Sequence, residues 1–327
     1  MAKLTVTLLA VAALVGLGRF AEAQQPNWPV RPVKLVVSTP PGSGQDVIAR
    51  ALADPLKMRL GQPFIVENVP GAGSVRSADV VVKAPADGYA VLVANIAPIG
   101  IVPQLRSNMP YDAARDLQPV GQINTTYFMA MVNPKRVPVS SFLELIELLK
   151  ANPNKYLYAS SGPGGIVHMQ TELFMQRTGT RMVHVPYKSV GEMTNALLGG
   201  FVDFGISTIA EPALTYVKSG ELKALAVTSD TMRPELPGVP TVASTIPNFA
   251  YGSVWQGLFV KTGTPQAIIE KLNAALTDYL KTPDGISLMS KLGYDAAPMS
   301  TDDFAKLVRL EVATWSQIIE ANNIKLE

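Results

Sequence analysis

The feature that most constrains the fold is a regular alternation of two kinds of segment from Val33 onward. Short apolar runs rich in Val and Ile alternate with longer amphipathic segments, which is typical of parallel strands joined by helices and predicts an α/β fold. Several short runs are almost continuously apolar, as in sheets covered on both faces. The predicted strands are 33–37, 64–67, 90–94, 117–123, 127–132, 156–159, 182–186, 201–206, 222–227 and 254–260.

Three helices are marked by signals at their amino ends. Ser141 with Glu144, and Ser189 with Glu192, have the spacing of capping boxes, in which the serine hydroxyl accepts an N–H three residues further on. Thr264-Pro265 predicts an N-cap followed by a proline at the first helical position. We therefore expect helices to begin just after residues 141, 189 and 264.

Composition excludes several classes of protein. Of 327 residues, 47% are hydrophobic and 17% are charged, which excludes a disordered chain and leaves enough length for two domains. Lys plus Arg is 28 against 26 for Asp plus Glu, a formal net charge of +2 without a basic run, so no nucleic-acid partner is expected. The chain has no cysteine, which excludes disulfides, thiolate metal sites and a cysteine nucleophile.

The first 23 residues have the pattern of a secretory signal peptide. Lys3 precedes an uncharged run over residues 4–18, and Ala21-Glu22-Ala23 is a small-x-small cleavage site. The run is shorter than the roughly 20 apolar residues needed to span a bilayer. We expect cleavage after Ala23 and export to the periplasm.

Two changes in composition indicate the domain organisation. Four prolines lie among Ser, Thr and Gly between residues 229 and 247, which is typical of a connector. A second change falls near residues 124–126, between two strand-like runs. Two crossings imply that domain 1 comprises residues 24–123 and 246–327, and that domain 2, residues 124–245, is inserted into it.

Two glycine-rich loops each follow a predicted strand and precede a predicted helix. The first is residues 38–46, Ser-Thr-Pro-Pro-Gly-Ser-Gly-Gln-Asp, and the second is residues 159–165, Ala-Ser-Ser-Gly-Pro-Gly-Gly. In open α/β sheets, ligands bind to loops at the carboxyl ends of strands. Glycine lets backbone N–H groups approach a ligand, and a helix N-terminus adds partial positive charge. The two loops therefore predict an anion site that needs no charged side chain.

Other interpretations of these loops are less well supported. The Gly-x-Gly at 42–44 could be half of a dinucleotide fingerprint, but Val47 stands where the third glycine belongs. Ser160 or Ser161 with His168 could be a nucleophile and base, but no Gly-x-Ser-x-Gly elbow is present. The two histidines have no acidic cluster beside them in sequence, so no metal site is expected. Tight turns that bind no ligand are a further alternative.

A series of motifs spread over nearly the whole chain carries a resemblance to a known family. They are Trp28-Pro29-x-Arg31-Pro32-Val33, Pro40-Pro41-Gly42-x-Gly44-x-Asp46, Val66-Glu67-Asn68-x-Pro70-Gly71-Ala72-Gly73, Pro85-x-Asp87-Gly88-Tyr89, Pro110-Tyr111-Asp112, Ala159-Ser160-Ser161-Gly162-x-Gly164 with His168, Val185-Pro186-Tyr187-Lys188 and Leu198-Gly199-Gly200-x-Val202-Asp203. In order and spacing they resemble the Bug, or TctC-like, periplasmic substrate-binding receptors of tripartite tricarboxylate transporters.

The resemblance implies a two-lobed periplasmic binding protein of the type II, Venus-flytrap kind, with a mixed, mostly parallel sheet in each lobe. Such a protein closes around a small carboxylate and delivers it to a membrane permease. It implies no enzymatic activity, catalytic residue, cofactor or metal, and we expect a monomer. It also implies that backbone N–H groups and hydroxyls of the two loops hold the carboxylate, partly through ordered water.

The candidate ligand-binding residues lie in the two loops and at the ends of two other strands. Asn95 follows the strand 90–94, and Asp203 is expected at the corresponding edge of domain 2, where it orients amides or water, or meets a ligand hydroxyl or ammonium group. His168 either contacts the ligand, directly or through water, or braces its loop from behind. The candidates are Ser38, Thr39, Gly42, Gly44, Asn95, Ser160, Ser161, Gly162, Gly164, His168 and Asp203.

The predicted function is the capture of a small carboxylate, expected to be a dicarboxylate. Ser38-Thr39 stand where the family usually has Pro and a bulky residue, and Gln45 replaces a Thr or a small residue, which predicts a roomier pocket. A flat aromatic diacid is a candidate ligand, and Arg106 is a more distant candidate donor. An exported hydrolase that uses Ser161 and His168, and a sensor that signals to a kinase, are the alternatives.

Overall fold

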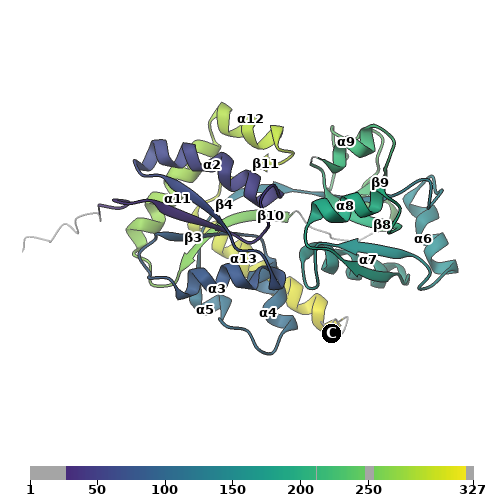
Figure 1. Cartoon of the computed structure of the whole chain (residues 1–327), viewed down its shortest axis with the longest axis horizontal. Helices are drawn as coiled ribbons and strands as arrows, with labels where there is room; N and C mark the ends of the chain where they lie inside the picture. Colours follow the sequence, from purple (N-terminus) through teal and green to yellow (C-terminus); the bar gives the residue numbers. More distant parts are fainter. Residues whose placement is uncertain (1–26, 211, 247–253, 322–327) are drawn as a thin grey trace, which may run out of the picture.

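The computed structural model describes residues 27–210, 212–246 and 254–321. They form two lobes that lie side by side along the long axis of the molecule (Figure 1), and each lobe is built on its own sheet. The predicted two-lobed α/β fold is confirmed. The predicted signal peptide, residues 1–23, lies outside the described residues.

The first lobe has a six-stranded mixed sheet. Its strands are β1 (Val33–Val37), β2 (Phe64–Asn68), β3 (Ala90–Ala94), β4 (Leu117–Thr126), β10 (Val254–Lys261) and β11 (Asp295–Ala296), in the order β11-β4-β10-β3-β1-β2. β2, β1 and β3 pair in parallel, β10 is antiparallel to both β3 and β4, and β11 is antiparallel to β4. Because β4 opposes a strand that is itself reversed, it points the same way as β1, so most strands share one direction.

The second lobe has a five-stranded mixed sheet of similar design. Its strands are β5 (Phe128–Val132), β6 (Leu157–Ser160), β7 (Val183–Pro186), β8 (Phe204–Thr208) and β9 (Lys223–Val227), in the order β7-β6-β8-β5-β9. β7, β6 and β8 are parallel, and β5 is antiparallel to β8 and β9. The sequence prediction placed the start of β8 too early, at Phe201. The Phe201 side chain is 74% exposed, and the strand begins at Phe204.

Helices cover both faces of each sheet. Those of the first lobe are α2 (Gly44–Leu60), η1 (Ala72–Ser74), α3 (Val75–Lys83), η2 (Ala97–Ile101), α4 (Val102–Leu105), α5 (Ala113–Asp116), α11 (Gln266–Leu280), α12 (Pro283–Lys291) and α13 (Thr301–Ala321). Those of the second are α6 (Phe142–Ala151), α7 (Ile166–Thr178), α8 (Val190–Leu198), α9 (Ala213–Lys218) and α10 (Val242–Thr245).

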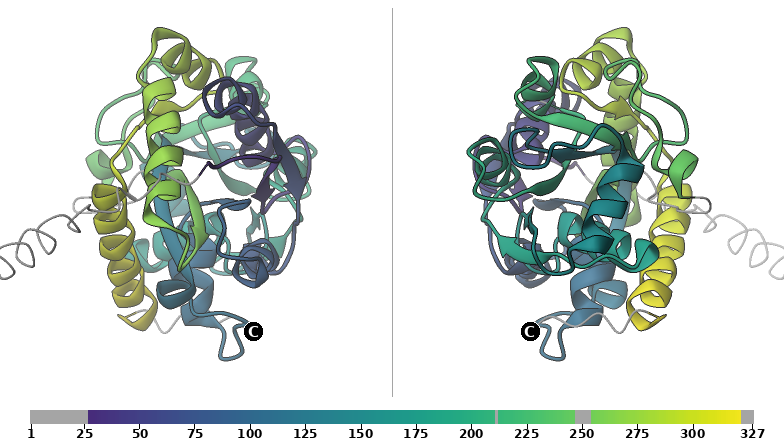
Figure 2. Two further views of the ribbon diagram at one scale, coloured as in Figure 1. Left: turned by 90° about the vertical axis from the view of Figure 1, so that its left-hand side faces the viewer. Right: turned by 90° about the vertical axis from the view of Figure 1, so that its right-hand side faces the viewer.

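Two separate cores lie on the two faces of the first sheet. Leu52 of α2 and Leu272 of α11 pack with Val91 on one face, while Phe304 of α13 packs with Leu92 on the other. The end views in Figure 2 show helices on both sides of the sheet. Burying each such side chain contributes about 1.5–3 kcal/mol, so these two cores fix the sheet that carries the first loop.

The two predicted capping boxes are present in part. The hydroxyl of Ser141 accepts the N–H of Glu144 at 3.1 Å, and that of Ser189 accepts the N–H of Glu192 at 3.2 Å. The Glu144 carboxylate reaches back to the N–H of Ser140, one residue before the serine that caps the helix. The starts of α6 and α8 are therefore as predicted.

The predicted start of α11 is wrong by one residue. Pro265 has extended backbone angles, φ −52° and ψ 132°, and is itself the N-cap, so the helix begins at Gln266. The hydroxyl of Thr264 donates to the carbonyl of Lys261 and does not cap the helix.

The chain first crosses between the lobes at a single residue. β4 ends at Thr126 and β5 begins at Phe128, so Tyr127 alone separates a strand of the first sheet from one of the second. The return crossing lies between α10 and β10. The first crossing falls a few residues later than the predicted boundary, and the domain limits given above stay a prediction.

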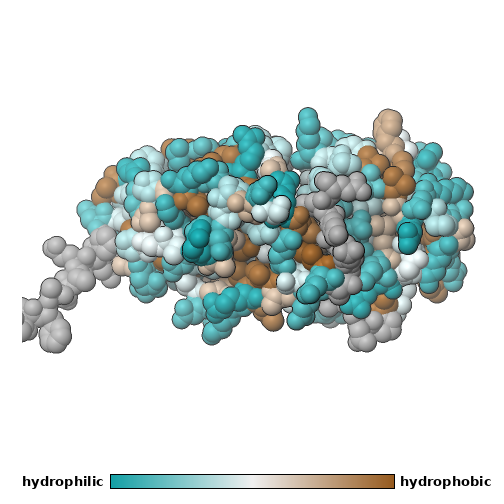
Figure 3. Space-filling view, turned by 90° about the horizontal axis from the view of Figure 1, so that it is seen from below, coloured by the Kyte–Doolittle hydropathy of each residue, from teal (hydrophilic) through white to brown (hydrophobic). Residues whose placement is uncertain are grey.

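In the portion of the chain that the structure describes, no helix is both long and apolar enough to cross a membrane. Seen from below (Figure 3), hydrophilic residues predominate over both lobes, and apolar residues occur singly or in small groups.

Candidate functional site

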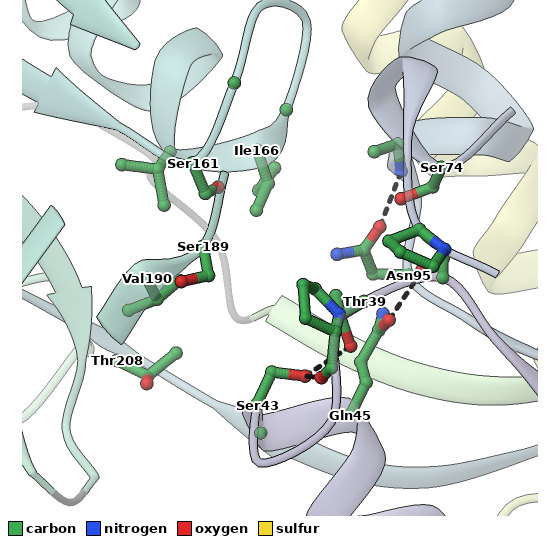
Figure 4. Close-up of a pocket in the computed structure, with 18 of the residues that line it drawn as sticks. Thr39, Ser43, Gln45, Ser74, Asn95, Ser161, Ile166, Ser189, Val190 and Thr208 are labelled. Carbon is green, nitrogen blue, oxygen red and sulfur yellow. Dashed lines mark hydrogen bonds between the residues drawn. The ribbon is translucent and has the colours of Figure 1, made fainter. Parts of the chain in front are cut away.

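A cavity of about 730 Å³ opens between the two lobes. In the first lobe it is lined by the loops after β1, β2 and β3, and in the second by the loops after β6, β7 and β8. These loops stand at the carboxyl ends of the parallel strands, where open α/β sheets bind ligands. Figure 4 shows Thr39, Ser43 and Gln45 on one side of the cavity and Ser161 and Val190 on the other.

Three helices begin at this cavity, and each presents free backbone donors to it. The first N–H groups of a helix have no acceptor within the helix. Within the described residues, six such N–H groups at the starts of α2, α7 and α8 have no protein acceptor, and their residues line the cavity. They belong to Gly44, Gln45, Ile166, Val167, Val190 and Gly191. The partial positive charges of three helix ends therefore converge on one space.

Charged side chains play little part in the cavity lining. Among the described residues that line the cavity, Arg106 and Lys188 carry a charge, and both are solvent-exposed. The rest of this described lining consists of hydroxyls, amides and apolar groups. Such an arrangement suits an anion held by backbone dipoles, and the anion site expected of the two loops stays a prediction.

Asp46 fixes the shape of the first loop. Its carboxylate accepts the N–H of Gly42 at 2.8 Å, the Nε–H of Arg50 at 3.0 Å and the Nδ2–H of Asn68 at 2.9 Å. Burial raises the pKa of Asp46, but these hydrogen bonds outweigh burial, so its pKa lies below the usual value. The N–H of Gly42 is therefore used inside the loop, and Gly42 lines the cavity without offering that donor.

Two side-chain amides in the first lobe have their oxygens occupied and their nitrogens free. The Oε1 atom of Gln45 accepts the hydroxyl of Ser38 at 2.6 Å, and the Oδ1 atom of Asn95 accepts the N–H of Ala97 at 2.9 Å. Both side chains line the cavity, and neither NH₂ group has a protein acceptor among the described residues. Figure 4 shows both side chains at the first-lobe side of the cavity. Hydrogen bonding thus leaves two amide donors for a ligand.

The second loop uses three of its N–H groups internally, among them that of Gly165, which donates to the carbonyl of Gly162 at 3.2 Å. The N–H of Gly162 donates to the hydroxyl of Ser160 at 3.1 Å, and the N–H of Gly164 donates to Nδ1 of His168 at 3.1 Å. Ser160, Gly164 and His168 are buried and do not line the cavity, whereas Ser161 and Gly162 do. His168 therefore lies behind the loop and does not line the cavity, an arrangement that fits the second of the two alternatives, in which it braces the loop.

The expected position of Asp203 is wrong. It precedes β8, at the opposite end of the strand from the cavity. Its carboxylate accepts the N–H of Leu157 at 2.9 Å and pairs with Arg136 at 3.3 Å. Asp203 thus joins the amino ends of two strands, and its distance from the site follows from the later start of β8.

Several lining residues were missed by the sequence analysis because their neighbours in space are remote in sequence. Tyr294 is 5% exposed, and its hydroxyl is within hydrogen-bonding reach of Gln256 and of Thr208 in the other lobe. Burial raises the pKa of Tyr294 to about 12, although both hydrogen bonds lower it. The same hydroxyl lies 2.4 Å from where a side chain on Gly44 would begin. Other lining residues not predicted are Ser43, Ser74 and Ser189.

The serine and histidine of the hydrolase hypothesis are not brought together. His168 bonds to Gly164 through Nδ1, and its Nε2 faces Glu172. Ser160 does lie against a histidine, with its hydroxyl 2.6 Å from Nε2 of His184, but it is fully buried behind the loop. The serine that lines the cavity is Ser161. The geometry therefore gives no support to acyl transfer by these residues.

Two α/β lobes with helix N-termini facing a cavity between them define a two-lobed solute-binding protein. The chain belongs to the TctC family, because the model of the tripartite tricarboxylate transporter family receptor matches residues 48–324. The resemblance to Bug and TctC-like receptors is thus confirmed. Protein BugT of Bordetella pertussis is 33% identical over 313 residues, which cover 95% of each chain.

Two solved structures of similar chains contain dicarboxylates. Rpa4515 of R. palustris with adipate has a TM-score of 0.85 and 31% identity, and the match covers 91% of this chain and 99% of that one. MatC of Rhodopseudomonas palustris with bound malate has a TM-score of 0.82 and 27% identity, with coverage of 89% and 100%.

Proposed function

We propose that this protein is the receptor of a tripartite transporter, which binds a dicarboxylate between its lobes and delivers it to a membrane permease. The observation that carries the proposal is the convergence of three helix N-termini on a cavity whose described lining is charged only at the solvent-exposed Arg106 and Lys188. Such donors suit an anion and need no counter-charge. The adipate and malate bound by similar chains support a dicarboxylate.

Each lobe would hold one carboxylate. In the second lobe the donors are the N–H groups at the starts of α7 and α8, together with the hydroxyls of Ser161 and Ser189. In the first lobe they are the N–H groups at the start of α2 with the amide nitrogens of Gln45 and Asn95. Hydrogen bonds to a charged group contribute about 1.5–3 kcal/mol each. Donors on both lobes would therefore stabilise a form closed around a diacid.

The lining between the polar ends favours an acid with an apolar body. Phe128, Ile166, Val190 and Val254 contribute apolar surface to the cavity. The small side chain of Thr39 lies at the first-lobe end, which supports the expectation of an acid larger than a four-carbon diacid, including a flat aromatic one.

Export and delivery complete the proposal. We propose that residues 1–23 direct the chain to the periplasm and are removed. The alternative role is that of a receptor that signals to a kinase. Uptake of the acid by cells lacking the protein separates the two roles: uptake should be lost if the protein delivers the acid to a permease, and should persist if it only signals.

The binding proposal is tested by thermal unfolding with a panel of acids, followed by titration calorimetry. Malate, adipate and terephthalate are compared with adipamide, which has the same chain as adipate but no charge. At 100 times its dissociation constant a ligand stabilises by about 2.7 kcal/mol, so a diacid should raise the melting temperature and adipamide should not. Equal shifts with adipamide, or hydrolysis of simple esters without diacid binding, would contradict the proposal.

A further inference from the structure

Three aromatic rings are stacked directly behind the second loop. The ring of His184 lies 4.3 Å from that of His168 and 4.8 Å from that of Tyr158, with interplanar angles of 17° and 14°. The rings come from three elements, β7, α7 and β6. His168 is 8% exposed and Tyr158 is fully buried. His184 is half-buried, and none of the three residues lines the cavity, so the stack supports the loop from the side away from a ligand.

The hydrogen bonds of His168 define its tautomer. A backbone N–H can only donate, so the Nδ1 atom that receives the Gly164 N–H must carry no proton. The proton of the neutral ring then sits on Nε2, which lies 3.6 Å from Oε1 of Glu172. The same Oε1 atom accepts the hydroxyl of Tyr158 at 2.5 Å. Both ring nitrogens thus have an identified neighbour: the Gly164 N–H for Nδ1 and the Glu172 carboxylate for Nε2.

The loop depends on this support because of its backbone shape. Gly162 and Gly164 have φ values of +119° and +73°, and α7 begins at an N-cap, Gly165, that has no side chain to cap it. The buried N–H of Gly164 would have no acceptor without His168, and an unpaired buried donor is costly. His184 holds the N–H of Gly162 indirectly, through the hydroxyl of Ser160.

We propose that His168 is a positioning residue for ligand binding, whose unprotonated Nδ1 atom anchors Gly164 and so leaves the N–H groups of Ile166 and Val167 directed at the ligand. This inference rests on the proposed carboxylate site. His184 and Ser160 anchor the other end of the turn, and Glu172 with Tyr158 fixes the proton of His168 on Nε2. The N–H groups of Gly162 and Gly164 are thereby bonded inside the lobe, and those of Ile166 and Val167 remain available to the ligand.

The anchoring is tested on the unliganded full chain by NMR. The ¹⁵N shifts of His168 should report the Nε2–H tautomer at neutral pH. In His168→Ala, amide hydrogen exchange at Gly164 should become roughly tenfold faster relative to the rest of the second lobe. In His168→Asn it should stay near the wild-type rate, because the Asn oxygen occupies the position of Nδ1 and still accepts. An Nδ1–H tautomer, or unchanged exchange in His168→Ala, would overturn the anchoring.

The consequence for binding is measured with adipate by titration calorimetry. His168→Ala should weaken adipate binding about tenfold or more and His168→Asn much less. Faster exchange at Gly164 with unchanged adipate affinity would overturn the positioning role. A wild-type protein that binds none of the diacids would instead refute the carboxylate site, while the tautomer and exchange results would still decide the anchoring.

Discussion

The guanidinium of Arg233 holds Asp295 across the boundary between the lobes. Nη1 lies 3.0 Å from Oδ2 and Nη2 lies 3.2 Å from Oδ1, a bidentate pair between the segment after β9 and strand β11. The same guanidinium bonds to Glu235 and lies 5.2 Å from the ring centre of Tyr127, the residue at the first crossing. One side chain thus ties three segments together where the lobes join.

We expect the Arg233–Asp295 pair to stabilise the arrangement of the lobes by about 1 kcal/mol, because it is bidentate but Asp295 is 46% exposed. The pair is measured by a double-mutant cycle of Arg233→Met and Asp295→Asn, with chemical unfolding as the readout. Additivity of the two changes within about 0.3–0.5 kcal/mol would show that the pair contributes nothing.

Gln45→Glu should weaken binding of a diacid at least about tenfold, since it replaces a free amide donor by a carboxylate that repels the ligand. The measurement is calorimetry with adipate. Gln176→Glu, which makes the same charge change on an exposed side chain away from the cavity, is the control and should bind as the wild type does. Similar losses in both variants would show that net charge, and not the amide of Gln45, is responsible.

Neighbouring serines should have different effects. Ser161→Ala removes a hydroxyl that lines the cavity, and the loss of a hydrogen bond to a charged group should weaken diacid binding by about 1.5–3 kcal/mol with little change in stability. Ser160→Ala leaves His184 and the Gly162 N–H without their partner, so the free energy of unfolding should fall as well. The contrast fails if Ser161→Ala unfolds as easily as Ser160→Ala.

Gly44→Ala should destabilise the protein, because the new Cβ would meet the hydroxyl oxygen of Tyr294 at 2.4 Å. Tyr294→Phe should relieve much of this cost, since the next ring atom is 3.7 Å away, an ordinary contact distance. Thermal unfolding of the two single variants and the double variant measures the coupling. Strictly additive losses would show that the two residues do not meet in this way.

Stability should fall with acid through the titration of His168. Burial, and to a lesser degree the nearby His184, lowers its pKa from 6.5 to about 4. The unfolded chain therefore takes up a proton at a higher pH than the native one, so this stability is complete above pH 6.5 and is lost as the pH falls toward 4. The loss amounts to about 3 kcal/mol.

The variant His168→Asn isolates this contribution from those of Glu172, whose pKa burial raises, and His184, whose pKa burial lowers. The free energy of unfolding of wild type minus that of His168→Asn, followed from pH 7 to pH 4, should decrease. A pH-independent difference would contradict the prediction.

The strands and the two loops could be predicted because their signals are local. Apolar runs marked the strands, and each glycine-rich loop lies between a strand and a helix as expected. The position of Asp203 was predicted wrongly because the start of β8 was placed too early, at Phe201. The strand begins at Phe204, so Asp203 lies before its amino end, away from the cavity. The donors of Gln45 and Asn95 depend on which amide atom is occupied, which only the contacts of Ser38 and Ala97 decide.

The placement of helix N-termini on both lobes has a mechanical consequence. In the receptor proposed above, closure of an empty cavity would move the positive end of α2 toward those of α7 and α8, and these like partial charges would oppose it. An anion between them would attract all three helix ends and so favour the closed shape. The outline of such a receptor would depend on whether it carries a ligand, and a membrane partner that recognises the closed outline would not be blocked by empty receptors.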